Sequence, residues 1–279
     1  MNLRRLGMVA GGLLFAASIS AAQLPQLRGG QRPGGRVSSG IKWARFDDFD
    51  GSFIVCRLYF DIGNWGNGGN WRVDYPRADI NLTFRLSELT TTSVMRHPRE
   101  EFNHVVVRAT DPLIYHCPFV MMTEPGRLDF SPDEAVGLRD YLLKGGFLWV
   151  DDFWGTFAWE NFADQMAAVL PPGQFPIVEL PLSHQVFHSL YEIRHKTQIP
   201  NAGFWTSTGG ATSEQGFDSA EPHIRAISDD RGRVMVLISH NTDFGDAFER
   251  EGDSHQYFLQ FAADAYAFGI NAIVYAMSH

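Results

Sequence analysis

The sequence predicts an α/β domain built around a mostly parallel β-sheet. From residue 53 to about residue 180, apolar runs with strand character alternate with stretches of helical spacing, which is the pattern of successive βαβ units. The central segment is 141–153, where a helix ends at Lys144, two glycines turn the chain, and an apolar strand runs to Asp151 and Asp152. Function in such sheets collects at the carboxyl ends of strands, so these aspartates are the first candidates for a site.

The composition is that of an acidic globular protein. The chain has 279 residues, 44% of them hydrophobic, and a formal net charge of −9. The charges are mixed along the chain, which argues against nucleic acid as a partner because sequence-independent binding needs a basic face. Two cysteines exclude a disulfide framework and a four-cysteine zinc site. We expect Cys56 and Cys117 to be small buried apolar residues, with a disulfide between them as the alternative.

The N-terminal segment has the features of a secretory signal. Residues 1–22 combine Arg4 and Arg5, an apolar run of about 14 residues and a small-residue end before Gln23. Residues 23–45 are rich in Gly, Pro and Arg and predict a flexible linker, which leaves 46–279 as a single domain. The expected location is periplasmic or secreted. The membrane would be contacted only if the segment stayed uncleaved as an anchor.

Capping residues and apolar patterns in the sequence predict the individual helices and strands of the domain. Asp79 is placed to cap a helix that continues to Leu89, and Ser131 with Glu134 forms a capping box for the helix before Lys144. Residues 196–221 show no period and predict a long surface insertion. The expected strands are 53–60, 104–108, 118–122, 147–151 and 175–180, followed by a hairpin of 224–228 and 234–239; the other expected helices are 157–169 and 256–267, the last resuming towards residue 277.

Several segments in fixed order resemble one bacterial family. They are RLYF at 57–60, WRVDYPRADINLTFRLSELT at 71–90, FSPDEAVGLRDYLLKGGFLWVDD at 130–152, LPLSHQVFHSLY at 180–191, SHNTDFGDAFE at 239–249 and FGINAIVYAM at 268–277. Together they resemble the domain of unknown function 4159 family. The resemblance implies a three-layer, flavodoxin-like sandwich related to class I glutamine amidotransferases, and it implies no reaction.

The amidotransferase comparison can be tested on the residues. Those enzymes carry a cysteine nucleophile on a sharp turn after a central strand, whereas here Asp151 and Asp152 occupy that place. Neither Cys56 nor Cys117 has the glycine-flanked setting of an exposed nucleophile. We therefore expect a non-catalytic binding or protein-interaction module, whose partner is a protein or a small molecule of the cell envelope.

The alternative function is an envelope-associated hydrolase that uses Asp151, Asp152, His184 and His240. Two carboxylates at one strand end could share a proton or attract a cation, although either could instead cap a helix. His184 and His188 would share one helix face, a metal-binding geometry, or would be structural if the segment is a turn. No cofactor is expected under the leading hypothesis, and a divalent metal belongs to this alternative.

Candidate ligand-binding residues lie in two loops. Trp71 and Asp74 follow a turn-rich run of glycines and asparagines, and Asn241 and Asp243 follow the second hairpin strand. Trp71 could stack on a ligand or fold back over the core, which we favour. The run GNGGN lacks the spacing and lysine of a phosphate-binding loop, and no GxSxG element of a serine hydrolase occurs.

Overall fold

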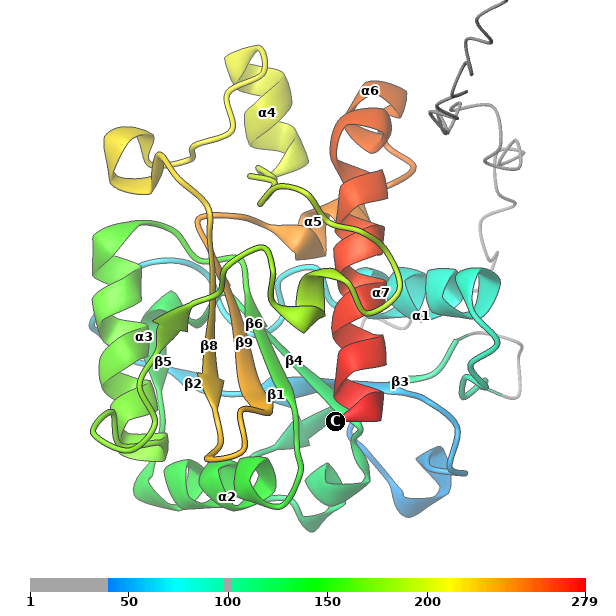
Figure 1. The fold of residues 1–279 in the computed structure, drawn as a ribbon, viewed down its shortest axis with the longest axis vertical. Coiled ribbons are helices and arrows are strands. Elements are labelled where there is room, and N and C mark those ends of the chain that lie inside the picture. Colours follow the sequence, from blue (N-terminus) through cyan, green and yellow to red (C-terminus); the bar gives the residue numbers. More distant parts are fainter. Residues whose placement is uncertain (1–39, 98–101) are drawn as a thin grey trace, which may run out of the picture. The chain divides into compact units, whose positions relative to one another are not determined.

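The computed structural model describes residues 40–97 and 102–279 (Figure 1). The expected signal segment, 1–22, and most of the expected linker lie outside the described residues. The end of that linker belongs to the folded domain, because Ala44 N donates to Val106 O (2.9 Å) and Val106 N donates to Lys42 O (2.8 Å). No helix within the described ranges is both long enough and apolar enough to cross a membrane.

A seven-stranded sheet forms the centre of the domain. Its first five strands, in spatial order, are mutually parallel: β3 (His104–Arg108), β1 (Val55–Tyr59), β4 (Phe119–Thr123), β6 (Leu148–Asp151) and β9 (Val234–His240). The antiparallel β8 (His223–Ser228) and then β7 (Val178–Glu179) complete the sheet. A separate antiparallel pair joins β2 (Asp61–Ile62) to β5 (Leu128–Asp129). The predicted α/β class and mostly parallel sheet are confirmed.

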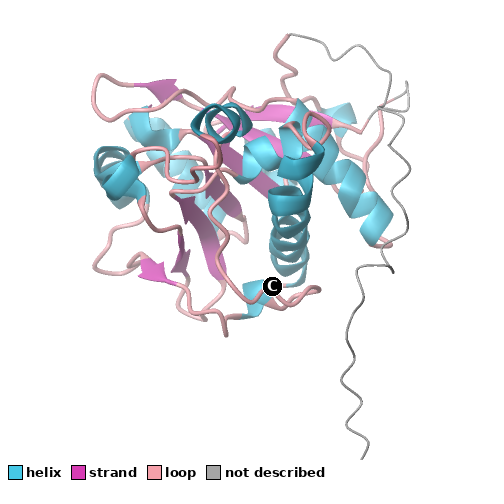
Figure 2. Cartoon of the chain, turned by 90° about the horizontal axis from the view of Figure 1, so that it is seen from above, coloured by secondary structure: helices cyan, strands magenta, loops and turns pink. Residues whose placement is uncertain are grey.

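Helices cover both faces of the sheet (Figures 1 and 2). One face packs against α1 (Arg77–Leu89), α5 (Phe244–Glu249) and α7 (Ala263–Ser278), and the other against α2 (Pro132–Leu143) and α3 (Gly155–Val169). Each interface has its own hydrophobic cluster. The remaining helical segments are η2 (Phe46–Asp48), η3 (Pro112–His116), η4 (Pro125–Arg127), η5 (Gln185–Phe187), α4 (Ala202–Thr208), η6 (Gly216–Ser219), α6 (His255–Tyr257) and the π-helical η7 (Phe258–Ala262).

The capping box and the two glycines before the central strand adopt the structures that the sequence predicts. Glu134 N donates to Ser131 Oγ (3.3 Å) and Ser131 N donates to Glu134 Oε2 (3.0 Å), which is the reciprocal capping box at the start of α2. Gly145 turns the chain with φ +107°. At Gly146 a Cβ would lie 2.4 Å from the ring of Tyr141, so only glycine fits against that ring.

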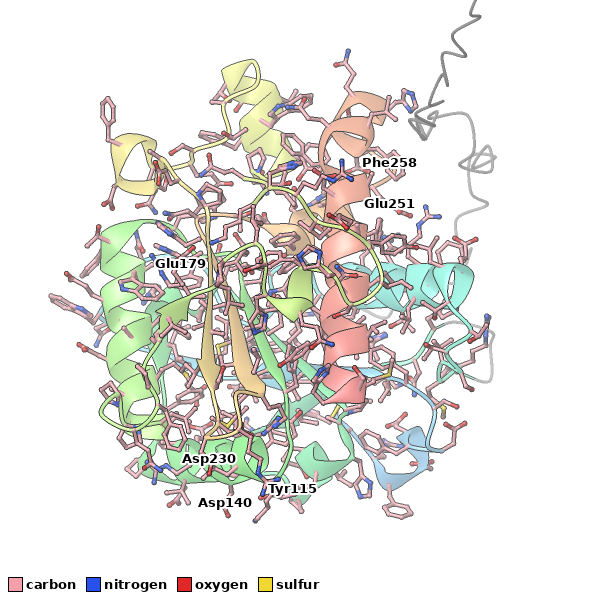
Figure 3. All side chains as sticks on the ribbon, in the orientation of Figure 1. Tyr115, Asp140, Glu179, Asp230, Glu251 and Phe258 are labelled. Carbon is pink, nitrogen blue, oxygen red and sulfur yellow. A yellow bond between two sulfur atoms is a disulfide. The ribbon has the colours of Figure 1, made fainter. Side chains whose placement is uncertain are left out.

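Three expected elements differ from those observed. Helix α1 begins at Arg77, and Asp79 is not its cap but lies inside the first turn, because its carboxylate pairs with the buried Arg57 (2.6 Å). The strand expected at 175–180 pairs only over β7, where Glu179 (Figure 3) binds Arg225 of β8 (3.1 Å). The 196–221 insertion contains two short helices, α4 and η6.

Cys56 and Cys117 form a disulfide, with Cα atoms 5.9 Å apart. The expectation of two separate buried thiols is therefore wrong. The reason is topological: β1 pairs directly with β4, and Cys117 lies two residues before Phe119, the partner of Val55. Strand neighbours of this kind are set by the order of the sheet, which a single sequence does not reveal.

The carboxyl ends of the parallel strands lie together at one edge of the sheet. In Figure 1 the β8–β9 turn is at the bottom, so β9 and the strands parallel to it run upward towards α4 and α5. The amino-end edge is marked by Tyr275 of α7, whose hydroxyl accepts from Val234 N (3.0 Å) and whose ring lies 6.3 Å from that of Phe147.

Replacing both cysteines by alanine should lower the free energy of unfolding by about 4 kcal/mol, because the bond joins residues 61 apart and restricts the unfolded chain. Urea unfolding with and without a reducing agent measures the effect. The reducing agent should destabilise the wild type and leave C56A/C117A unchanged. A wild type that keeps its urea midpoint in the reducing agent would contradict the cross-link.

Candidate functional site

Three buried carboxylates meet above the carboxyl ends of the central strands. Asp152 follows β6 directly, Asp243 precedes α5, and Asp74 comes from the loop between β2 and α1. One oxygen of each lies within 4.8 Å of an oxygen of each of the others. We call Asp74, Asp152 and Asp243 the aspartate cluster. Three segments that are far apart in the sequence thus place acidic groups at one point.

Left-handed backbone conformations create this convergence. Glu124, Asp152 and Asn241 are the first residues after β4, β6 and β9, and their φ angles are 53°, 58° and 60°. Asp74 has φ 62°. Such angles are uncommon outside glycine and gather at functional sites, where the surrounding structure holds them in place. Here they turn the chain sharply at the end of three neighbouring strands.

Two members of the aspartate cluster have hydrogen-bond partners, and the third has an oxygen without one. Asp152 Oδ1 accepts from Trp154 Nε1 (3.0 Å), and Asp243 Oδ1 accepts from Asp246 N (2.6 Å). Oδ2 of Asp74 is buried and has no hydrogen-bond partner among the described residues. Because buried polar atoms are rarely left unsatisfied, this oxygen is a candidate contact for a cation, a water molecule or a proton.

Glycine at position 245 allows the chain to approach that oxygen. A Cβ at Gly245 would lie 2.3 Å from Asp74 Oδ2, closer than any real contact. The backbone N–H of Gly245 is turned to another carboxylate, Asp151, whose Oδ2 accepts from it at 2.8 Å. The start of α5 therefore packs tightly between Asp74 and Asp151.

Asp151 lies beside the aspartate cluster but is fully engaged by the protein. Its Oδ1 is 2.5 Å from Ser239 Oγ, which also accepts from Trp149 Nε1 (2.9 Å) and lies 3.1 Å from Val150 O. When Asp151 is protonated, its hydroxyl can donate to Ser239 Oγ, and the serine hydroxyl can then donate to Val150 O. Each polar group in this set then has a hydrogen-bond partner. Burial raises the pKa of Asp151 to about 7 despite the hydrogen bonds from Ser239 and Gly245, which oppose it.

The aspartate cluster carries more negative charge than its surroundings balance. Burial raises the pKa of Asp74 well above its usual range, and Arg57 only partly opposes this. Burial also raises the pKa of Asp152, and the negative charges of Glu124 and Asp74 raise it further. The pKa of Asp243 is raised by burial and then by the charges of Asp152 and Asp74. Glu124 has its pKa raised to about 7 by burial, although Gly69 N donates to it. These groups favour either protonation or a bound cation.

Among the described residues, Arg57 is the buried arginine or lysine, and its charge acts on Asp74 of the aspartate cluster. It is fully buried on β1, pairs with Asp79 through Nη2 and Oδ1 (2.6 Å), and donates to Thr123 Oγ1. Burial alone would lower its pKa, but Asp79, followed by the charges of Asp74 and Asp151, raises it. Since Asp79 pairs directly with the guanidinium, Arg57 offsets the charge of the aspartate cluster only in part.

A second acidic group shares Asp74 with the aspartate cluster but has its own cation. Oxygens of Asp74, Asp246 and Glu249 also lie within 4.8 Å of one another. Arg250 Nε approaches Asp246 Oδ1 at 3.5 Å and Glu249 Oε2 at 2.9 Å. In addition, Asp246 Oδ2 accepts from Ala202 N (2.5 Å) at the start of α4. Arg250 therefore offsets the charge of this group in part, although burial still raises the pKa of Asp246 and the charge of Asp246 raises that of Asp74.

His240 does not join the carboxylates. Its Nδ1 accepts from Arg225 Nη1 (3.1 Å) and its Nε2 donates to Gly155 O (3.1 Å), a pattern that fits the neutral ring. The ring packs 4.8 Å from that of Phe153 and 5.1 Å from that of Trp159. Burial lowers the pKa of His240 to about 4, so it is a neutral structural group.

His184 and His188 flank the turn η5 rather than sharing a helix face. His184 Nδ1 accepts from Val186 N (3.2 Å), and His188 Nε2 lies 2.6 Å from Leu182 O. The ring of His184 is 5.9 Å from that of Tyr275, which marks the amino-end edge of the sheet. The potential metal-binding groups formed by the described residues contain no histidine. The structure does not bring the four proposed hydrolase residues together.

The remaining ligand-binding candidates have structural partners. Trp71 is buried, with its ring 5.4 Å from that of Tyr59 and 5.6 Å from that of Tyr75, so it folds back over the core as we favoured. Asn241 Oδ1 accepts from Gly155 N (2.8 Å) and its Nδ2 donates to Glu221 O (3.0 Å). Asn241 thus links the start of α3 to the segment before β8.

Two important residues were not among the sequence candidates. Glu124 follows β4 immediately, as Asp152 follows β6, and its position at a predicted strand end was the available signal. Arg57 interrupts the apolar run FIVCRLYF, and a charged residue inside a buried strand requires a buried partner. The sequence alone did not show that Asp79 is this partner.

Comparison with known families gives a match over most of the chain. The profile of a domain of unknown function, DUF4159, matches residues 59–277. No curated protein matches the chain. The match includes Asp74, Asp152 and Asp243, so the complete aspartate cluster lies inside the matched region.

The raised pKa of Asp151 predicts a pH dependence with a definite sign. The folded chain holds this proton up to about pH 7, whereas an unfolded aspartate loses it near pH 4. Folding therefore binds a proton in this window, and stability from this group is lost as pH rises. Asp151→Asn mimics the protonated side chain. We expect its unfolding free energy, relative to wild type, to rise by about 1.4 kcal/mol per pH unit between pH 4.5 and 6.5.

Urea unfolding in EDTA across this range measures the difference. Asp230→Asn, at an exposed aspartate of the β8–β9 turn (Figure 3), is the matched control and should follow the wild type. Parallel pH profiles of D151N and wild type would show that Asp151 is ionised throughout.

Proposed function

Because this chain belongs to the DUF4159 family, whose function is unknown, we propose a function from its geometry: a binding module whose aspartate cluster holds a hard divalent cation. The observation that carries the proposal is the buried Asp74 Oδ2, which lacks a partner among the described residues. It belongs to a group of carboxylates with raised pKa values and insufficient positive charge nearby. A divalent ion would supply both the missing contact and the missing charge.

The spacing of the oxygens suits calcium. Ca²⁺ binds oxygen ligands at about 2.3–2.6 Å, so two oxygens on opposite sides of one ion are about 5 Å apart. The oxygens of Asp74, Asp152 and Asp243 lie within 4.8 Å of one another, inside this limit. Carboxylates without histidine or cysteine also favour Ca²⁺, Mg²⁺ or Mn²⁺ over Zn²⁺. Ca²⁺ is therefore the first ion to test.

Binding is favoured over hydrolysis because the acid–base groups of the alternative are dispersed. Asp151 is held by Ser239 and Gly245, His240 by Arg225 and Gly155, and His184 lies near Tyr275. A hydrolase would need a free acid–base group beside the ion to activate water. Asp151 is the one that lies beside the aspartate cluster, and both of its oxygens are taken by Ser239 and Gly245. A metal-dependent hydrolase using Asp151, Asp152, His184 and His240 has less support.

The proposed setting is the cell envelope. The signal-like residues 1–22 support export, and the Cys56–Cys117 disulfide suits an oxidising compartment. We further propose a flavodoxin-like fold of the class I amidotransferase type, in which Asp151 and Asp152 take the place of the nucleophile. A protein or small molecule of the envelope, rather than nucleic acid, is the expected partner.

Asp74→Asn provides the sharpest test, because it should affect stability and binding in opposite directions. Without metal, the amide avoids the cost of burying or protonating the carboxylate, so the melting temperature should rise. With Ca²⁺ at about 100 times its Kd, wild type should gain roughly 5–10 °C and D74N should gain little. Calorimetric titration of EDTA-treated protein should show at least a tenfold loss of Ca²⁺ affinity in D74N.

Two controls define the interpretation. Asp230→Asn removes an equal charge from an exposed turn and should leave binding unchanged. Mg²⁺ and Mn²⁺ are titrated in parallel, to show which ion the cluster prefers. If none of the three ions at 10 mM shifts the melting temperature of the wild type, the cation proposal is wrong.

A further inference from the structure

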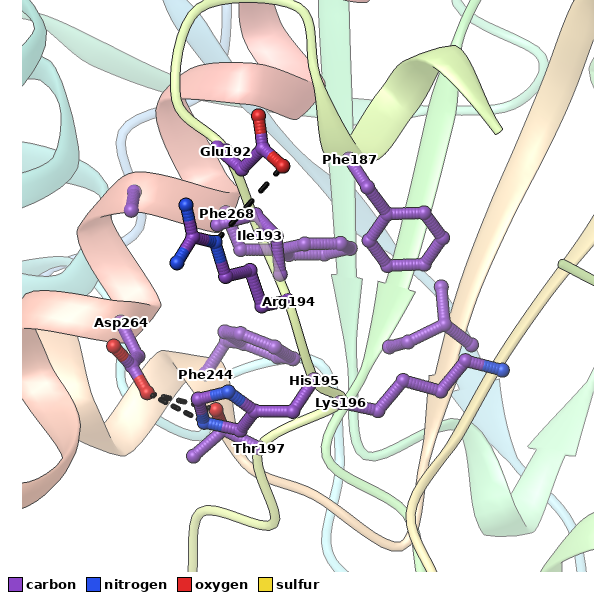
Figure 4. A pocket seen from close by; sticks show the side chains of 12 residues that line it. Phe187, Glu192, Ile193, Arg194, His195, Lys196, Thr197, Phe244, Asp264 and Phe268 are labelled. Atoms are coloured by element: carbon purple, nitrogen blue, oxygen red, sulfur yellow. Dashed lines mark hydrogen bonds and ion pairs between the residues drawn. The ribbon is translucent and has the colours of Figure 1, made fainter. Parts of the chain in front are cut away.

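A cavity of about 210 Å³ lies between α7 and the segment 192–197 (Figure 4). Its inner wall consists of the buried side chains of Phe187, Ile224, Phe244 and Phe268. No member of the aspartate cluster lines it. A dry apolar cavity of about 150 Å³ accommodates benzene, so this one has room for a ring with a short substituent, on the order of eight to ten non-hydrogen atoms.

The Asp264 carboxylate, at the mouth of the cavity, accepts hydrogen bonds from two neighbouring side chains. Asp264 Oδ2 accepts from Thr197 Oγ1 (2.9 Å) and from His195 Nε2 (3.1 Å), as the dashed lines of Figure 4 show. Because Nε2 of His195 donates to Asp264, its other ring nitrogen, Nδ1, can accept a hydrogen bond when the ring is neutral. The two hydrogen bonds hold the Asp264 carboxylate towards Thr197 and His195.

Arg194 is a cation at the mouth with only a weak partner. Its side chain is 81% exposed, and its Nε is 3.9 Å from Glu192 Oε1, which is itself 65% exposed. Exposed pairs of this length contribute little free energy and exchange readily. A carboxylate on a bound molecule could pair with the guanidinium through two parallel hydrogen bonds, a stronger arrangement. The cavity therefore combines an apolar interior with a cation at its entrance.

We propose that this cavity, with Arg194 at its mouth, binds small aryl carboxylates. The ring lies among the phenylalanines, and the carboxylate faces the Arg194 guanidinium. The proposal does not depend on the cation at the aspartate cluster, because the residues involved are different and the test contains no metal. It assigns this domain a second ligand-binding position.

The test uses fluorine NMR with 4-fluorophenylacetate and its neutral analogue 2-(4-fluorophenyl)ethanol. We expect wild type to bind the acid with Kd below about 1 mM, as the size of the ligand allows. Arg194→Gln should weaken the acid at least tenfold and change binding of the alcohol by less than twofold. Arg231→Gln, an exposed arginine in the β8–β9 turn, is the matched control and should bind both as wild type does.

A cavity-filling variant locates the bound ring. Ala267→Phe projects from α7 into the cavity, where Ala267 forms part of the wall, and should abolish binding of both compounds. Ala267→Leu is the smaller alternative if α7 does not tolerate phenylalanine. The proposal is overturned if the acid does not bind at 5 mM, if filling the cavity leaves binding intact, or if R194Q affects acid and alcohol equally.

Discussion

The buried pairing of Arg57 with Asp79 holds the acidic edge of this domain together. A guanidinium taken out of water needs hydrogen-bond partners. Each guanidinium nitrogen of Arg57 has one, from Asp79 on α1, from Thr123 at the end of β4 and from the carbonyl of Val73 (3.5 Å). These contacts fix the loop that carries Asp74 against the sheet. Because the guanidinium is paired with Asp79, it offsets the neighbouring carboxylates only in part, and their pKa values stay raised.

Much of the fold could be predicted because its signals are local. The parallel strands are apolar runs. The capping box at Ser131 starts helix α2, and the glycines 145 and 146 turn the chain after that helix. The errors concern contacts between distant segments. The Cys56–Cys117 bond depends on which strand lies next to β1, and the place of Asp79 depends on how α1 packs against Arg57 of β1. No local pattern specifies either contact.

The candidate site was predicted in part for the same reason. Asp152, Asp74 and Asp243 were selected because they follow strands or lie in turns, and the structure brings them together. The sequence could not predict that Asp152 joins the cluster and that Asp151 binds Ser239 instead. Consecutive residues on a strand face opposite ways, and the left-handed conformation of Asp152 directs it to the cluster while Asp151 meets Ser239.

The disulfide divides the acidic edge into two parts with different covalent constraints. The ring closed by Cys56 and Cys117 contains Asp74, while Asp152 and Asp243 belong to the chain outside it. Local opening of the chain outside the ring can separate these carboxylates without breaking a covalent bond. An ion held by the aspartate cluster would then tie the ring to the rest of the sheet by a reversible cross-link made of coordination bonds.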